Sequence, residues 1–340
     1  MSPTSFIAIC FYYMSRLNIF ACCIKNPVSM QRVVPFRFVY TALFLLALLV
    51  AGSLSGKKAM AQEATVKKGS SYIPIPADSQ QVDFEQQELM LHRYFDSLAH
   101  AREDDTRDEL NRKILKRFRR ILEDPRSFDY PFEAIENAGI LKSSDEKVKI
   151  YNWNVPYEAG YNVFHCFLQY RKPDTLLTFE LNDQSGKIEE PANKTLTADK
   201  WYGALYYDII AKPGRFDQKY YTLLGFDPND FLTNRKVIDV LYFDKQDQPM
   251  FGASIFKNQR EISKRILFEY NQFANMMLRY DREKEMIVYD HLSPSKPQYE
   301  GQREYYGPDF SYDGLKFENG IWNTYFDLDL RLNEIDFEED

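Results

Sequence analysis

The side chains that could carry out chemistry are few, and their spacing limits what each group could do. His92, Asp96 and His100 lie four residues apart, so a helix would place them along one face. Two imidazoles and a carboxylate could bind zinc. However, the two histidines would lie about 12 Å apart along the helix axis, too far for one ion to touch both. We therefore interpret this set as a solvated helix face and predict no metal site.

Cys166 beside His165 suggests a thiol nucleophile with its base. The surrounding sequence favours a strand, and neighbouring side chains of a strand point to opposite faces. Cys166 would then share a face with Phe164 and Leu168, and His165 would point the other way. We expect a buried core thiol.

Asp327 and Asp329 would project from one face of a strand predicted at 321–332. Two strand residues separate them by about 7 Å, near the separation of the carboxyl groups in glycoside hydrolases. Phe326, Leu328 and Leu330 would face the core on the other side. A half-exposed strand with a local ion pair explains this pattern, and we prefer that interpretation.

Local catalytic motifs are absent from the sequence, which has no G-x-S-x-G, H-E-x-x-H, P-loop, G-x-G-x-x-G or C-x-x-C. An active site could still be assembled from distant carboxylates, and Asp290 and Asp309 are candidates. Asp290-His291 and the DPND turn at 227–230 are weak signals by themselves. We predict no cofactor.

Two sets of residues could bind a partner. Six cations within nine residues could contact an anionic surface or an acidic partner: Arg112, Lys113, Lys116, Arg117, Arg119 and Arg120. They could equally form a solvated helix face, paired in part with Asp108 and Glu109 one turn earlier.

The three tryptophans, Trp153, Trp201 and Trp322, could stack on sugar rings together with some of the many tyrosines. Aromatic residues of strands more often form core or cross-strand pairs. Glycan binding and core packing are therefore both open for these side chains.

Two helices are predicted near the start of the globular part. Phe84, Leu91, Phe95 and Leu98 recur at helical spacing, and a second stripe runs from Leu110 to Ile121. A short acidic turn separates the stripes, which favours an antiparallel hairpin within a helical region at 83–142.

From about residue 146 the hydrophobic period changes to two, and short turns separate the segments, which favours antiparallel pairing. The predicted fold class is α+β, with an N-terminal helical hairpin followed by a large, mainly antiparallel β-meander domain at 143–340, built as a sandwich, an open barrel or a partial propeller. The candidate strands are 147–154, 161–170, 175–182, 202–211, 219–226, 235–243, 250–256, 263–270, 274–280, 285–290 and 321–332.

The distribution of charge predicts export. Residues 1–61 hold six of the 43 basic residues and no acidic residue, and the uncharged stretch 38–56 precedes Ala59-Met60-Ala61. This pattern is typical of a secretory signal peptide at 30–61, cleaved near Ala61-Gln62. An uncleaved membrane anchor is the alternative, because 19 uncharged residues approach the roughly 20 that span a bilayer.

Residues 1–29 fit poorly before such a signal, and Met30 would make a normal start, so an over-extended N-terminus is one interpretation. Residues 62–82 are polar, contain Pro74 and Pro76, and are predicted to be a linker. Cleavage would leave 37 basic against 50 acidic residues, a net charge of −13 that argues against nucleic-acid binding. Cys166 would be the only remaining cysteine, which excludes an internal disulfide.

Four segments resemble a family of exported Bacteroidota proteins without an established activity. They are YYTLLGFDPNDFLTNRKVIDVLYFDKQDQPMFGASIF at 220–256 and the later RILFEYN, MIVYDHLSP and GPDFSYDGL. The resemblance covers roughly residues 145–330. It implies a location in the cell envelope and supplies no chemistry.

Together these observations predict an exported, periplasmic or cell-surface protein that binds an envelope protein or a glycan without catalysis. The alternative is an envelope hydrolase of the glycoside type, whose carboxylates converge only in the folded β domain.

Overall fold

Two helices and a series of mainly antiparallel strands make up the part of the chain that the structure describes. The structure is a computed structural model, and it describes residues 82–214, 218–259 and 261–329. The predicted signal peptide and nearly all of the predicted linker lie outside these residues. The prediction of a mixed α+β fold that is mainly β is confirmed.

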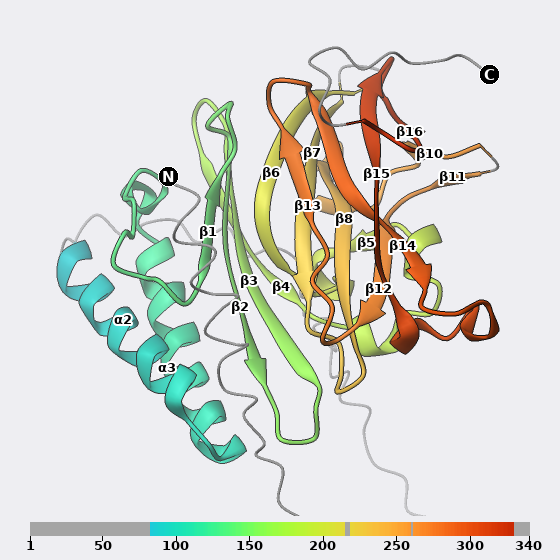
Figure 1. Cartoon of the computed structure of the whole chain (residues 1–340). Coiled ribbons are helices and arrows are strands. Elements are labelled where there is room, and N and C mark those ends of the chain that lie inside the picture. The colour runs from blue at the N-terminus through green and yellow to red at the C-terminus, as the bar shows by residue number, and fades with distance from the viewer. Residues whose placement is uncertain (1–81, 215–217, 260, 330–340) are drawn as a thin grey trace, which may run out of the picture. The chain divides into compact units, whose positions relative to one another are not determined.

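The predicted hairpin consists of α2 (Phe84–His100) and α3 (Asp104–Leu122), which pack side by side (Figure 1). Asp83 caps α2 by accepting a hydrogen bond from the N–H of Gln86. A short 3-10 helix, η1 (Pro125–Phe128), follows α3. No helix among residues 82–329 that are described has the length and apolar character needed to span a bilayer.

The first sheet is an antiparallel meander in the order β1-β2-β3-β4. Its strands are β1 (Gly139–Lys142), β2 (Val148–Pro156), β3 (Asn162–Arg171) and β4 (Leu176–Asn182). β1 falls within the stretch that we had assigned to the helical region.

The second sheet has the order β5-β9-β8-β7-β6, and β12 also pairs with β8. Its strands are β5 (Leu196–Thr197), β6 (Leu205–Pro213), β7 (Lys219–Asp227), β8 (Thr233–Phe243), β9 (Pro249–Phe251) and β12 (Ile266–Asn271). One of the sheets curls into a half-barrel.

The third sheet has the order β11-β10-β16-β15-β14-β13, with β10 and β16 parallel and the other neighbours antiparallel. Its strands are β10 (Phe256–Lys257), β11 (Ile262–Ser263), β13 (Leu278–Asp281), β14 (Met286–Pro294), β15 (Tyr306–Glu318) and β16 (Ile321–Tyr325).

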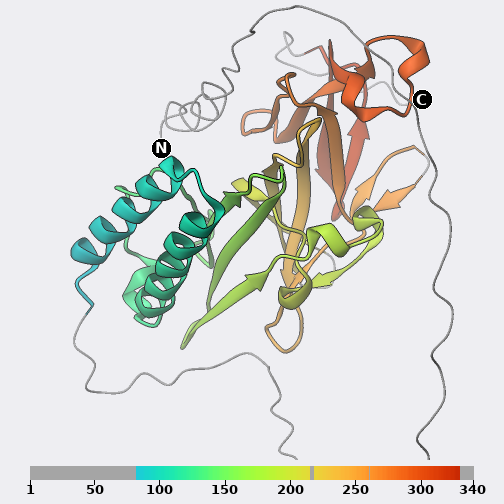
Figure 2. The ribbon, with the colours of Figure 1, turned by 90° about the horizontal axis from the view of Figure 1, so that it is seen from below.

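Three hydrophobic cores join the helices and the three sheets into layers. The helices and one face of the first sheet enclose a core that contains Phe118 and Tyr151. The other face of the first sheet packs against the second sheet through residues such as Ile150 and Leu223. The second and third sheets enclose the last core, which contains Ile238. Figure 2 shows the helices packed on the outer side of the first sheet.

This layering explains the sequence of β2. Eight of its nine residues are buried, because Tyr151, Trp153 and Val155 face the helices while Val148 and Ile150 face the second sheet. Because both faces of β2 are covered, its polar residues Lys149, Asn152 and Asn154 are buried as well.

Candidate functional site

The cations of the predicted contact patch lie along α3, and two of them form ion pairs within the molecule. Lys113 lies 2.6 Å from the carboxylate of Glu109, as the i,i+4 spacing predicted. Arg119 forms two hydrogen bonds of 2.7 Å with the carboxylate of Glu180 on β4. The hydrogen bond to Lys113 holds the pKa of Glu109 below its usual range.

The remaining cations divide into two pairs. Arg112 donates to a backbone carbonyl one turn earlier, and Arg117 donates to a side-chain amide of α2. Lys116 and Arg120 are exposed and have no hydrogen-bond or ion-pair partner within residues 82–329 as described. Two of the six cations of α3, Lys116 and Arg120, are therefore without a partner among the described residues, so the unpaired positive charge on this helix is small.

The three tryptophans are each buried in a different core, with relative exposures of 1%, 0% and 0% for Trp153, Trp201 and Trp322. Each indole N–H donates a hydrogen bond within 3.0 Å, and the acceptors are Asn111, Tyr206 and Thr222. Buried indoles need such partners. The structure places none of the three rings where a sugar could stack on it, so core packing is the role that it gives them.

His92 and His100, for which a zinc site was considered and not predicted, contact different backbone carbonyls. His92 Nδ1 lies 2.8 Å from the carbonyl of Ala134, and His100 Nδ1 lies 2.7 Å from the carbonyl of Asp96. No group of three or more potential metal ligands occurs in the part of the chain that the structure describes.

The opposite orientations of Cys166 and His165 are confirmed. Cys166 lies in the core between the first two sheets, where burial raises the pKa of its thiol. His165 faces the helices, stacks on Trp153 and lies 2.9 Å from the amide of Asn111. Burial lowers the pKa of His165 to about 4, so the ring is neutral at pH 7.

The prediction of a strand at 321–332 with two aspartates on one face is wrong. β16 ends at Tyr325, and Asp327 has a left-handed backbone with φ of 55°. The N–H of Asp327 donates to Asp313, which turns the chain back toward β15. Leu328 is buried as expected, but Phe326 is 46% exposed rather than in the core.

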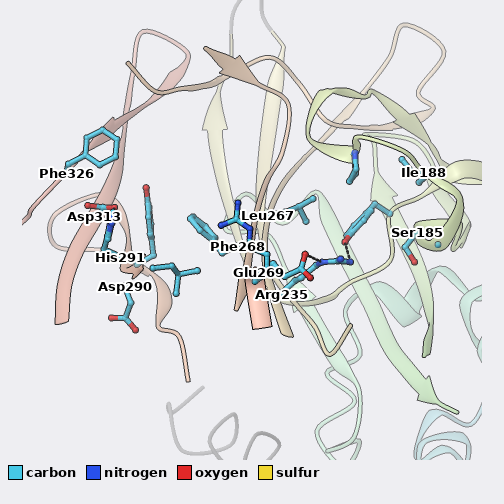
Figure 3. Close-up of a pocket in the computed structure, with 16 residues that line it drawn as sticks. Ser185, Ile188, Arg235, Leu267, Phe268, Glu269, Asp290, His291, Asp313 and Phe326 are labelled. Carbon is cyan, nitrogen blue, oxygen red and sulfur yellow. Dashed lines mark hydrogen bonds and ion pairs between the residues drawn. The ribbon is translucent and has the colours of Figure 1, made fainter. Parts of the chain in front are cut away.

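A cavity of about 690 Å³ lies beside β12 and β14 (Figure 3). It is lined by residues from the β4–β5 connection, β8, β12, β14 and β15: Ser185, Gly186, Ile188, Pro191, Tyr202, Arg235, Leu267, Phe268, Glu269, Tyr289, Asp290, His291, Leu292, Arg303, Asp313 and Phe326. Sequence reasoning singled out only Asp290, His291 and Phe326 among these residues.

One end of the cavity holds a charged network around Arg235. Its guanidinium lies 2.9 Å from Glu269 and 3.8 Å from Asp227, which also accepts a hydrogen bond from Tyr202. Asp227 is buried and does not line the cavity. Burial raises the pKa of Asp227 to about 7, although the charge of Arg235 lowers it.

The middle of the cavity is apolar. The rings of Phe268 and Tyr289 lie 4.6 Å apart, and Leu267, Leu292 and Ile188 add aliphatic surface around them. An apolar middle between polar ends is typical of sites that bind small molecules or short segments.

The other end is built on an irregularity of β14. The register with β15 shifts between Asp290 and Leu292, and four consecutive residues, Tyr289 to Leu292, reach the cavity. His291 Nδ1 lies 2.7 Å from Asp313, and this hydrogen bond raises the pKa of His291. Asp313 is buried, while the side chain of His291 is 43% exposed (Figure 3).

Asp290 differs from the other carboxylates of the cavity because no basic side chain among the described residues pairs with it. Its carboxylate accepts the N–H of Met277 at 2.7 Å. Burial raises the pKa of Asp290, and the charge of Asp309 adds to the shift. Arg303 also lines the cavity, and its guanidinium lies 4.7 Å from the centre of the Tyr306 ring.

Comparisons with protein-family models, curated proteins and solved structures found no match to this chain. The chemistry of the site therefore has to come from its own side chains.

Proposed function

We propose that the protein is an exported, non-catalytic binding protein and that the cavity between β12 and β14 holds its ligand. The observation that carries the proposal is the cavity itself, about 690 Å³ with an aromatic and aliphatic middle and charged groups at both ends. Cavities of this size enclose most of a small ligand, and a few polar groups then fix its orientation.

The pairing of the charged groups favours binding over catalysis. Glu269 is held by Arg235, and Asp313 is held by His291. Carboxylates bonded to basic partners serve well as fixed hydrogen-bond acceptors. The stacked sheets, which we propose form a sandwich-like support, keep these groups in place.

The setting of the binding protein follows from the sequence. The signal peptide predicted at 30–61 and the resemblance to exported Bacteroidota proteins support a periplasmic or cell-surface location, with a membrane anchor as the alternative. The ligand would then be an envelope protein or a glycan. The acidic balance of the chain argues against nucleic acid.

Gly186 offers a way to block the cavity without disturbing the fold. A Cβ atom added at Gly186 would meet no atom within 4 Å, so the fold should tolerate a side chain at this lining position. Gly186→Trp should therefore add bulk to the lining of the cavity and reduce the room for a ligand. Gln246→Trp, in the exposed turn between β8 and β9, is the matched control.

The test exposes the purified proteins to an envelope extract of the source cells and then weighs them by native mass spectrometry. We expect added mass on the wild type and on Gln246→Trp, and none on Gly186→Trp. Equal added mass on all three proteins, or none on any, would contradict the proposal.

A glycoside-type hydrolase is the second candidate, because two neighbouring carboxyls have pKa values shifted apart. Burial raises the pKa of Asp290, whereas hydrogen bonds from Ser311 outweigh the effect of burial and lower the pKa of Asp309. Glycoside hydrolysis uses a carboxyl with a raised pKa as the acid beside a second carboxyl with a lower pKa, and these two directions fit that pairing.

Assays of envelope oligosaccharides separate the two candidates. The binding proposal predicts no turnover. Turnover that is lost in both Asp290→Asn and Asp309→Asn, and kept in Glu283→Gln on an exposed turn, would establish the hydrolase instead.

A further inference from the structure

The residues of β12 that line the cavity show that one edge of this strand faces the cavity. Leu267, Phe268 and Glu269 are consecutive, and all three line the cavity. Neighbouring side chains of a strand point to opposite faces, and β12 pairs with β8 in regular register without a bulge. A cavity that touches both faces of a regular strand must run along its edge.

No further strand pairs with that edge in the part of the chain that the structure describes, although η6 (Arg303–Tyr305) and β15 lie against β12. β12 pairs only with β8, on its other side. In an antiparallel pair, every second residue turns its N–H and C=O away from the partner. Some of the backbone groups of β12 therefore point toward the cavity.

The open stretch has defined ends. At its start, the N–H groups of Lys264 and Arg265 donate to the carbonyl of Ala192. At its far end, the side chain of Asn271 donates to the carbonyl of Glu304. Between them lie residues 266–270, and five extended residues span about 17 Å.

The side chains around this edge differ on its two faces. Glu269 meets Arg235 on one face, and Phe268 meets Tyr289 on the other. An extended chain lying along β12 would place its alternate side chains in these two environments. This arrangement gives a backbone-pairing site its specificity.

Resting on the proposed function, we propose that the ligand is an extended peptide segment of another protein, which adds to β12 as an antiparallel or parallel strand and carries a basic side chain that pairs with Asp290. Three carboxylates and two guanidiniums line the cavity, and Asp290 is the carboxylate whose basic partner is missing among the described residues. A lysine or arginine of the ligand supplies that partner. A saccharide has hydroxyl groups that can bond to backbone groups, but it lacks the regular spacing of N–H and C=O groups that matches an extended strand.

The test uses the full chain and a library of acetylated hexapeptide amides with alternating apolar and polar residues, half of them with one lysine. We expect lysine-containing peptides to bind with a Kd below about 100 µM. The best peptide should slow hydrogen exchange of the amides of Leu267 and Glu269, which face away from β8.

The decisive control is the same peptide with N-methyl groups on alternate residues, which keeps the side chains but removes half of the backbone donors. Its affinity should fall by about tenfold or more. Asp290→Asn should remove the preference for lysine, and Glu283→Gln should keep it.

Strand addition is overturned if no peptide binds, if N-methylation of each alternate set of residues in turn leaves affinity unchanged, or if the amides of Leu267 and Glu269, which face away from β8, are already protected in the free protein. These failures differ from failure of the proposed function. If Gly186→Trp still removes a bound envelope component, the cavity is a binding site for another kind of ligand.

Discussion

The polar networks between the helices and the first sheet are closed, whereas those that line the cavity are partly open. Away from the cavity lining, β8 also holds a closed pair, Asp239 with Arg265 at 2.9 Å. In the first region, Lys149 is 3% exposed and its ammonium donates to three backbone carbonyls at the end of η1. Asn111 links the rings of Trp153 and His165 in the same closed manner. Around the cavity, His291 and Arg235 have one face on a protein partner and another toward open space.

The difference separates support from function. Closed networks such as those of Lys149 and Asn111 fix a packed interface, because their buried donors have acceptors. Open networks keep bonding capacity for something outside the chain. We therefore expect changes in the first region to alter stability, and changes around the cavity to alter binding.

The largest effect should come from the core of the first region. Phe118 is fully buried against Trp153 and Tyr151. Phe118→Ala should lower the free energy of unfolding by about 3–5 kcal/mol, measured by chemical denaturation. Phe310→Ala, at a side chain that is 91% exposed, should change it by less than about 0.5 kcal/mol. Similar changes in the free energy of unfolding for the two variants would contradict a tightly packed core in the first region.

His165 should make the first region sensitive to acid. Burial lowers its pKa from 6.5 to about 4, so between these values the unfolded chain binds a proton that the folded chain does not. Stability should fall by up to about 3 kcal/mol as the pH drops from 6.5 to 4. The measurement is the unfolding free energy as a function of pH. His165→Gln should flatten this part of the curve of unfolding free energy against pH. A curve that the substitution leaves unchanged would show that the His165 ring is accessible to solvent and would contradict the prediction.

His291 should respond in the opposite direction and more weakly. Its pKa is raised mainly by the hydrogen bond to Asp313, so its contribution is present below pH 6.5 and is lost as the pH rises through the raised value. NMR titration should place the two histidines on opposite sides of 6.5. Asp313→Asn should bring His291 back toward its ordinary value; a His291 pKa below 6.5 in the wild type would contradict the open network.

The smallest effect is expected on the surface of α3. Arg119→Ala breaks the paired hydrogen bonds with Glu180, and both side chains are about half exposed. Surface ion pairs contribute about 0.2–1 kcal/mol, and less at high salt. Denaturation at low and high salt measures the loss. A loss above 2 kcal/mol would place this pair among the closed contacts of the first region.

The sequence predicted the elements whose signal is local. Both helices and the strands β2, β3 and β4 follow from hydrophobic period, since packing on the core sets that period. β15, the longest strand at 13 residues, was missed. Its Gly307-Pro308 and Asp313-Gly314 pairs are typical of turns, but both pair with β14, on either side of the register shift at 309–311.

The cavity could not be predicted, because its lining comes from segments more than one hundred residues apart, such as Ser185 and Asp313. Asp290-His291 was the only local hint in β14. The tryptophans were candidates for sugar binding but lie in the cores, because aromatic content alone does not distinguish a stacking surface from a core. Only the three-dimensional layering assigns Trp153, Trp201 and Trp322 to separate cores.

The most direct test of the binding site is photo-cross-linking in the source cells with a benzophenone amino acid at Phe326 on the cavity rim or at Lys116 on α3. Our account predicts an adduct from position 326 that disappears when Gly186→Trp is added, and little from position 116. Adducts from position 116 alone, or an adduct from 326 that survives Gly186→Trp, would contradict it.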